Sequence, residues 1–272
     1  DSHTVVTPLS QMMVPLVEDF INQGGSKEDA VDSASTMLES LYGFDVVHTP
    51  YKHIYSSASV TDEVDDQIRY GFILAGISSW TEMAAEENGA NNQATFNSAL
   101  LGRQMAADID DDGKLNGTVL FGKTPLGAQI YRNAIADSIL DMVNSTRNTT
   151  TLDIKDMLLL LSTIAESDHK LYDGVAIKPF DDEQPLVEPI SFSLGEYFKG
   201  EAVFSFQVLD KTGSAKAEFG IDGVDLGSID DNSNPQLTID TLGYGYGEHD
   251  LSITVTDLMG NRKTEHYTVY FD

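Results

Sequence analysis

The sequence predicts two domains of different class, an all-helical domain followed by a β-sandwich. Apolar residues recur with helical spacing up to about residue 170, and with a period of two beyond about residue 200. Between these halves lies PFDDEQPLVEP, whose three prolines and four acidic residues predict an extended linker. We therefore expect a helical domain over 1–178, a linker over 179–189 and a sandwich over 190–272.

Local signals place the expected helix ends. Thr7-Pro8 predicts a helix start, because Thr caps the free amides and Pro is favoured at the first helical position. Pro15 should kink this helix or delay its start. Later helices are expected to open at Ser26, at Thr61, before Phe96 and at Thr124-Pro125, and the last to run over about 152–166.

Short alternating apolar runs predict the strands of the second domain. Turn sequences such as Lys-Thr-Gly, Asp-Gly and Met-Gly-Asn separate these runs, which is typical of an all-β sandwich. The expected strands cover 203–208, 217–221, 237–239, 251–255 and 267–271.

Charge and composition exclude several classes of function. The formal net charge is −28 with a pI of about 4.2, so a nucleic acid or an anionic membrane surface would be repelled. The absence of cysteine excludes disulfides, thiolate metal sites and a cysteine nucleophile. No apolar run approaches the roughly 18 residues of a membrane helix, so we expect no membrane insertion. The chain shows no leader at Asp1, and we expect any export signal to lie outside this sequence.

Four phrases of the second half carry a resemblance in their combination and order. They are DKTG at 210–213, FGIDG at 219–223, GEHDL at 247–251 and TDLMGN at 256–261. This half resembles the bacterial immunoglobulin-like domains that are repeated in secreted and surface proteins. The resemblance implies an immunoglobulin-like β-sandwich and an extracellular or cell-surface location.

The first half is similar to the helical segment that precedes such repeats in large proteobacterial surface proteins. The matching phrases are VTPL at 6–9, DIDDDGKLNG at 108–117 and YRN at 131–133. No enzymatic activity is implied by this resemblance.

The acidic phrase DIDDDGKLNG has the start of an EF-hand calcium loop. Such a loop needs acids at positions one, three and five, glycine at six, a carbonyl ligand at seven and a glutamate at twelve. Val119 stands at position twelve, so the loop is incomplete and a distant acid or water would have to complete it. A solvated acidic turn is the alternative. The expected ligands of a structural Ca²⁺ are Asp108, Asp110, Asp112, the Lys114 carbonyl and Asn116.

Two further segments are candidates for binding. The linker acids 181–183 could hold calcium at the domain junction, or be a solvated acidic linker. Tyr244 and Tyr246 stand between glycines, where exposed rings could stack on a sugar or on a neighbouring module, although packing at a strand edge is the alternative. We find no nucleophile elbow, phosphate loop, dinucleotide fingerprint or His-Glu-x-x-His motif, and assign no catalytic residue or organic cofactor.

The sequence thus predicts a non-catalytic fragment of a large bacterial cell-surface or secreted protein. Its expected role is adhesion, spacing or display, with neighbouring modules of the same chain as partners and a host protein, matrix protein or glycan as a further possible partner. An accessory or glycan-binding module of a secreted hydrolase is the alternative. A hydrolase in the helical domain is a third, which a deep pocket with converging carboxylates would support.

Overall fold

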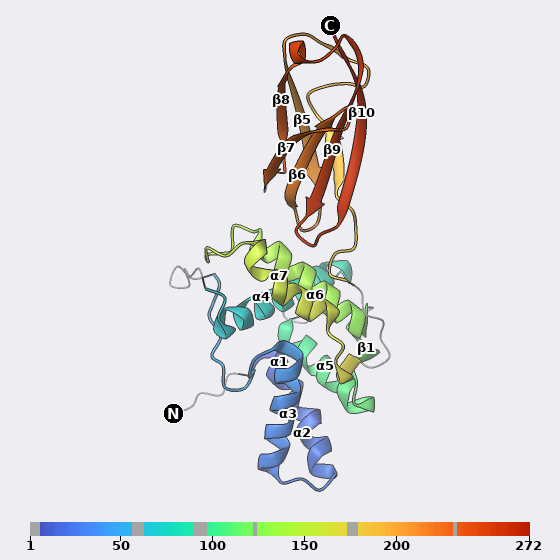
Figure 1. Ribbon diagram of the computed structural model, residues 1–272. Coiled ribbons are helices and arrows are strands. Elements are labelled where there is room, and N and C mark those ends of the chain that lie inside the picture. The colour runs from blue at the N-terminus through green and yellow to red at the C-terminus, as the bar shows by residue number, and fades with distance from the viewer. Residues whose placement is uncertain (1–5, 56–62, 90–96, 122–123, 173–178, 231–232) are drawn as a thin grey trace. The chain divides into compact units, whose positions relative to one another are not determined.

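The structure is a computed structural model, which describes residues 6–55, 63–89, 97–121, 124–172, 179–230 and 233–272 (Figure 1). The chain divides into two compact units, Asp1–Phe180 and Asp181–Asp272. Helices dominate the first unit and strands the second, as the two hydrophobic periods predict. Among the described residues, no helix is long and apolar enough to cross a membrane.

The first unit is built from helices and one hairpin. Its elements are α1 (Pro8–Gln11), α2 (Met13–Asn22), α3 (Lys27–Tyr42), α4 (Asp66–Glu87), α5 (Ser98–Asp112), β1 (Asn116–Phe121), β2 (Thr124–Gly127), α6 (Ala128–Val143), α7 (Ile154–Glu166) and the 3₁₀ turn η2 (Lys170–Tyr172). Helix α4 buries residues around most of its circumference, among them Ile68, Phe72, Ile73 and Ile77. It therefore forms the centre of the core of this unit.

The first helix starts where its capping signal predicts. The Thr7 hydroxyl accepts from the Ser10 amide, and the Ser10 hydroxyl accepts from the Thr7 amide. Pro15 is the third residue of α2, where its missing amide hydrogen would have had no partner within the helix. The proline therefore delays the start of the long helix to Met13, one of the two outcomes that the sequence allows.

Two expected helix starts are wrong. Helix α4 begins at Asp66 with Asp65 as its cap, and Thr61 lies outside the described residues. Thr124 and Pro125 belong to β2, which pairs antiparallel with β1, and α6 begins only at Ala128. The N-terminal unit is therefore helix-rich but not all-helical. A Thr-Pro pair is extended both before a helix and in a strand. Here Thr124 and Pro125 pair with β1, so they form a strand instead of the start of the helix.

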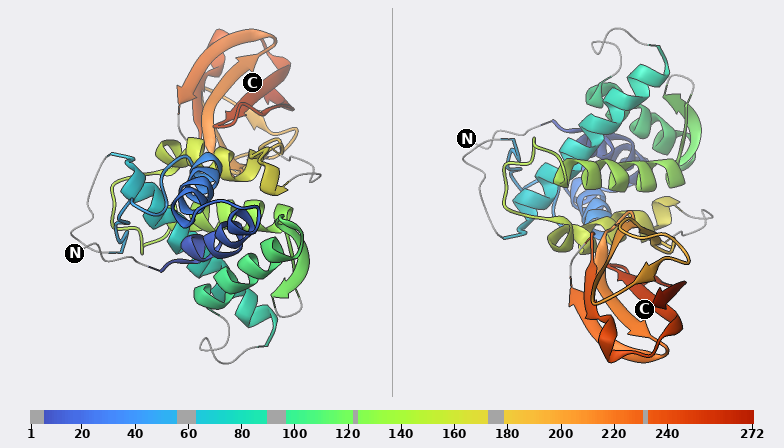
Figure 2. Two further views of the ribbon diagram at one scale, coloured as in Figure 1. Left: turned by 90° about the horizontal axis from the view of Figure 1, so that it is seen from below. Right: turned by 90° about the horizontal axis from the view of Figure 1, so that it is seen from above.

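The second unit consists of two sheets that face each other (Figure 1; Figure 2). One sheet has the strand order β3-β5-β8 and the other β4-β10-β9-β6-β7. The strands are β3 (Leu186–Pro189), β4 (Tyr197–Phe198), β5 (Glu201–Leu209), β6 (Ser214–Ile221), β7 (Val224–Asp230), β8 (Gln236–Asp240), β9 (Gly247–Asp257) and β10 (Arg262–Phe271), with the 3₁₀ turn η3 (Thr241–Gly243) before β9.

A single hydrophobic core joins the two sheets. Phe204 and Phe206 of β5 are fully buried, as are Ile253 and Val255 of β9 and Val269 of β10. Alternate residues of these strands point inward, which is why the period-two pattern locates them. The five strands expected from the sequence correspond to β5, β6, β8, β9 and β10.

The expected linker is partly a strand. Residues 186–189 form β3, which pairs antiparallel with β5 from Leu186↔Leu209 to Pro189↔Phe206. The division between the units falls between Phe180 and Asp181, so the acidic residues of the segment belong to the β-rich unit. The prolines do not exclude a strand here, because β3 is an edge strand and Pro189 is its last residue.

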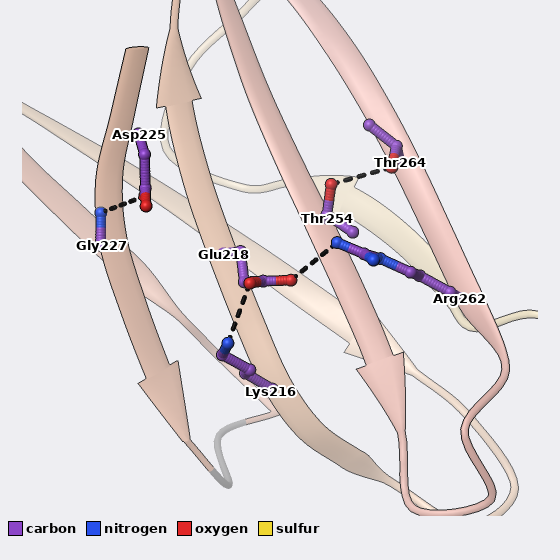
Figure 3. A network of polar contacts seen from close by, with 7 residues as sticks. All are labelled: Lys216, Glu218, Asp225, Gly227, Thr254, Arg262 and Thr264. Carbon is purple, nitrogen blue, oxygen red and sulfur yellow. Dashed lines mark hydrogen bonds and ion pairs between the residues drawn. The ribbon is translucent and has the colours of Figure 1, made fainter. Parts of the chain in front are cut away.

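The outer face of the larger sheet carries charged and hydroxyl side chains. Glu218 of β6 accepts hydrogen bonds from Lys216 and Arg262, and Thr254 pairs with Thr264 across β9 and β10 (Figure 3). Such exposed pairs contribute little to stability. They show that this face is solvated, in agreement with the alternation of apolar and polar residues.

Candidate metal centre

Three aspartates of the second unit form a compact carboxylate cluster. Each of Asp181, Asp210 and Asp257 offers one carboxylate oxygen, and these oxygens lie within 4.8 Å of one another. Asp181 and Asp257 are 6% and 2% exposed, and Asp210 is partly buried. The three residues come from the segment before β3, the turn between β5 and β6, and the end of β9. In the part of the chain that the structure describes, no other group of three acidic or histidine side chains meets this geometry.

Asp210 is held by the tight turn that follows β5. Its Oδ1 accepts from the Thr212 amide at 2.8 Å, the Thr212 hydroxyl at 2.9 Å and the Gly213 amide at 3.0 Å. Gly213 has a φ of +86°, which favours glycine at the fourth position of this Asp-x-x-Gly turn. Because Oδ1 closes the turn, Oδ2 is not needed for it.

Asp257 closes a second turn of the same kind between β9 and β10. Its Oδ1 accepts from the Met259 and Asn261 amides, each at 2.8 Å, and its Oδ2 accepts from the Asn261 side-chain amide at 2.9 Å. Gly260 again has a positive φ, of +92°. The first residues of two Asp-x-x-Gly turns that are far apart in the sequence thus lie close together.

Asp181 is joined to both turns. Its Oδ2 accepts from the Thr212 hydroxyl at 3.1 Å, and its backbone carbonyl accepts from the Asn261 side-chain amide at 3.2 Å. The hydroxyl of Thr212 lies within hydrogen-bond distance of the carboxylates of both Asp181 and Asp210, which share its one proton, and the residue is only 1% exposed. The segment that leads into β3 is therefore fastened at this cluster.

The electrostatics of the cluster favour a cation. Burial raises the pKa of Asp210, and the negative charges of Asp181 and Asp257 raise it further, against the opposing effect of the hydrogen bonds from Thr212. Carboxylates this close repel one another when ionised, and a divalent cation would relieve that repulsion. The ligand atoms are all hard oxygens, which suit Ca²⁺ or Mg²⁺ rather than a softer metal.

The sequence-predicted calcium residues are placed differently. Asp108, Asp110 and Asp112 lie on the last turns of α5, and the αL residue Gly113 ends that helix. Residues two apart on a helix do not face each other, so the structure does not bring the three carboxylates to one point. Calcium at this segment remains a prediction of the sequence alone.

Asp108, Asp112 and Asn116 of that segment take part in hydrogen bonds within the protein. Asp108 is fully buried, and its Oδ2 accepts from the Asn116 and Gly117 amides at 2.9 and 3.1 Å. Asp112 accepts from the Lys114 amide and from the Asn116 side chain. These bonds connect the end of α5 to the start of β1.

A cavity of about 340 Å³ lies beside the end of α5. Glu18 and Asp19 of α2 line it together with residues 110–112. It is acidic, but the described oxygens of these side chains do not converge as closely as those of Asp181, Asp210 and Asp257.

The two tyrosines expected to contact a ligand differ in exposure. Tyr246 is 88% exposed. Tyr244 is partly buried and packs edge-on against Phe271 and His249, with ring centroids 5.7 and 6.1 Å away. Packing at a strand edge therefore accounts for Tyr244, while Tyr246 is available to a partner.

The carboxylate cluster was only partly visible in the sequence. The sequence offers Asp181 among the linker acids, whereas Asp210 and Asp257 stand in the DKTG and TDLMGN phrases without a sign of a shared site. The repetition of Asp-x-x-Gly after two strands is the signal that could have paired them. Their convergence depends on the strand order β6-β9, which the periodicity does not determine.

Comparison with known proteins leaves the family open. No family model matches the chain, and no curated protein matches it. Among solved structures, the fibronectin(III)-like modules of CbhA from Clostridium thermocellum match at 22% identity and a TM-score of 0.28, covering 32% of this chain and 94% of that chain.

Two further matches are an endo-beta-1,4-mannanase from Thermotoga petrophila and OgpA from Akkermansia muciniphila. The mannanase is 13% identical with a TM-score of 0.29, and the match covers 54% of this chain and 36% of the mannanase. OgpA is 14% identical with a TM-score of 0.24, and the match covers 75% of this chain and 51% of OgpA. At these TM-scores the similarities carry no argument about family or function.

Proposed function

We propose that this chain is a non-catalytic part of a large bacterial cell-surface or secreted protein, in which an immunoglobulin-like module is stabilised by a structural calcium ion. The module acts in adhesion, spacing or display, between neighbouring modules of the same chain. The observation that carries this proposal is the cluster of Asp181, Asp210 and Asp257.

The position of the cluster supports a structural role for the ion. The cluster joins the segment leading into the sandwich to two turns of the sandwich. An ion at this point would hold the leading segment against the module and resist its displacement under load. The ligands also belong to turns whose backbone is already organised by hydrogen bonds, so little ordering would be needed on binding.

Calorimetric titration of the full chain with Ca²⁺ tests this proposal, with Asp210→Asn as the central variant. Asparagine keeps the Oδ1 acceptor that closes the turn and removes one negative charge from the cluster. We expect saturable calcium binding in the wild type, and affinity reduced by roughly tenfold or more in Asp210→Asn.

Two variants serve as controls. Asp225→Asn alters an exposed aspartate of β7 that also accepts from an amide two residues on, that of Gly227 (Figure 3). It should leave calcium binding unchanged. Asp110→Ala tests the site predicted from the sequence. Loss of binding in Asp110→Ala with wild-type binding in Asp210→Asn would move the ion to α5, and no binding in the wild type would remove it altogether.

A glycan-binding accessory module of a secreted hydrolase is the second candidate. Tyr246 favours it, since its ring is 88% exposed and can present an apolar face together with a polar hydroxyl to a partner. Tyr197 and Tyr270 form a second exposed aromatic feature, with rings stacked at a centroid distance of 4.9 Å and Tyr197 66% exposed. Flat exposed rings suit the apolar faces of sugars.

Retention on insoluble polysaccharides tests this alternative. Tyr246→Ala should reduce retention, whereas Leu242→Ala, which changes a 68% exposed aliphatic residue of the same loop, should not. Equal retention of both variants and the wild type, or no retention of any, would count against glycan binding through Tyr246.

A further inference from the structure

His249 occupies an unusual position at the end of the sandwich where β9 begins. The side chain is 9% exposed and stacks on Phe271, with ring centroids 4.5 Å apart. Its Nδ1 lies 2.6 Å from Asp222 Oδ2, in the turn between β6 and β7. Its Nε2 lies 2.7 Å from the backbone carbonyl oxygen of Gly245, in the loop before β9. One imidazole thus connects two loops that are distant in the sequence.

Both partners of the imidazole are hydrogen-bond acceptors. A neutral imidazole carries one N–H, so it donates to one acceptor and turns a lone pair toward the other. Only the doubly protonated ring donates to both. The amide of Asp250 donates to Asp222 Oδ1 at 2.9 Å, and this bond, with the charge of His249, keeps the pKa of Asp222 below its usual value. Asp222 is therefore the ionised partner, and its charge favours the protonated form of His249.

Loss of the proton affects the two bonds unequally. The carboxylate of Asp222 is a stronger acceptor than the carbonyl of Gly245, since bonds to ionised groups are about twice as strong as neutral ones. The remaining proton therefore stays on Nδ1, and the lone pair of Nε2 then faces the Gly245 oxygen at 2.7 Å. That repulsion acts on the loop and leaves the bond to the β6–β7 turn in place.

Other charged groups near the imidazole are engaged elsewhere. Glu248 and Asp250, which flank His249 on β9, alternate to the outer face of the sheet. There Glu248 accepts from the Tyr270 hydroxyl and Asp250 from His266 Nδ1. On β10 the residue opposite His249 is Val269. Asp222 is thus the ionisable group that acts on His249, through both a hydrogen bond and its charge.

We propose that His249 is a protonation-dependent latch, which holds the loop 241–246 against the sandwich when the imidazole is charged and releases it when the imidazole is neutral. Gly245 lies between the packed Tyr244 and the exposed Tyr246, so the latch controls how Tyr246 is presented to a partner. The latch shares no group with the candidate metal centre, because the partners of His249 are Asp222 and Gly245 whereas that centre consists of Asp181, Asp210 and Asp257.

The sign of the pH dependence follows from the two partners. Burial lowers the pKa of His249, but the bonds to Asp222 and Gly245 outweigh burial and raise it above the usual value of 6.5. The latch is therefore fully present below pH 6.5 and is lost as pH rises through the higher folded value. At the acid end, the pKa of Asp222 is lowered below 3.8, so the contribution of its charge disappears as pH falls through that lower value.

NMR titration of the full chain tests the latch, with calcium held saturating throughout. Long-range ¹H–¹⁵N spectra report the protonation and tautomer of His249, and amide exchange reports the loop 241–246. We expect hydrogen exchange of the loop amides to become faster at the same pH at which His249 loses a proton. The proton that remains on the imidazole should be on Nδ1. Asp222→Asn should move both transitions to lower pH. Asparagine suits this position because Asp222 has a φ of +50°, which asparagine tolerates.

Asp250→Asn is the matched control. It removes one charge from the residue that follows His249, but from the carboxylate that accepts from His266 rather than from His249. The loop transition should then stay at the wild-type pH. A loop whose exchange is independent of pH, or whose transition is the same in Asp222→Asn as in the wild type, would overturn the proposal. So would a His249 that remains neutral at pH 6.

Discussion

Asp108 shows at the scale of one residue how burial decides what a carboxylate does. The sequence presents it as the first ligand of a calcium loop, beside Asp110 and Asp112. In the fold it is fully buried and accepts two amide hydrogen bonds from the start of β1, while Asp110 and Asp112 are exposed. The same residue type thus acts as a connector at one position and as a solvated charge two residues later.

This difference predicts unequal effects of two substitutions. Asp108→Ala leaves two amides without their acceptor and should lower the free energy of unfolding of the first unit by about 2 kcal/mol. Asp110→Ala should change it by less than about 0.5 kcal/mol. Urea unfolding followed by Trp80 fluorescence, in the presence of a chelator, measures both. If instead Asp108→Ala is neutral in chelator and abolishes calcium binding, Asp108 is a ligand and not a connector.

The residue types of the two Asp-x-x-Gly turns follow from the local geometry of each turn. In each, one glycine with positive φ lets the chain turn, and the aspartate accepts the amides that the turn leaves free. These requirements alone explain the residue types in the sequence. That Asp210 and Asp257 also meet Asp181 is a property of the assembled sheets, which no single turn reveals.

At the scale of the element, the same Thr-Pro signal has different outcomes at its two positions in the chain. Thr7 caps α1 and Ser26 caps α3, each accepting from the amide three residues on. Thr124-Pro125 has the same letters but lies in β2. An extended Thr-Pro pair suits a helix N-cap and a strand alike, and pairing with β1 makes Thr124-Pro125 part of a strand, so that α6 begins only at Ala128.

Three strands of the second unit that the sequence missed each lack the period-two signal for a different reason. Strand β7 is exposed or partly exposed along its whole length, so its residues show no alternation between core and solvent. Strand β4 has two residues and pairs with β10 in parallel, and β3 ends in a proline. The period-two signal depends on several alternating buried residues, which β7 lacks altogether and which β3 and β4 are too short to show.

At the scale of the whole molecule, we expect calcium to stabilise one of the two units and not the other. The candidate metal centre lies entirely within Asp181–Asp272, whereas Trp80, the only tryptophan, lies in α4 of the first unit. A ligand that binds a folded unit stabilises that unit alone, by about 2.7 kcal/mol at a concentration one hundred times its Kd.

We therefore expect calcium to raise the melting temperature of the second unit and to leave that of the first unit unchanged. Scanning calorimetry of the full chain should resolve the unfolding transition of the sandwich. We expect calcium to raise the melting temperature of this transition and a chelator to lower it. The transition reported by Trp80 fluorescence should stay in place. A calcium-dependent shift of the Trp80 transition alone would place the ion in the helical unit and contradict the assignment to Asp181, Asp210 and Asp257.

The sequence by itself determined the order of the two units, because helical and alternating apolar periods are local properties of the chain. It also determined the acidic surface, the turns of the sandwich and the caps of α1 and α3. Only the tertiary structure decided which acids converge. Asp108, Asp110 and Asp112 are neighbours in the sequence but are separated around a helix, while Asp181, Asp210 and Asp257 are far apart in the sequence and meet because β6 pairs with β9. Ligand geometry depends on such long-range pairing, and so does the environment of His249.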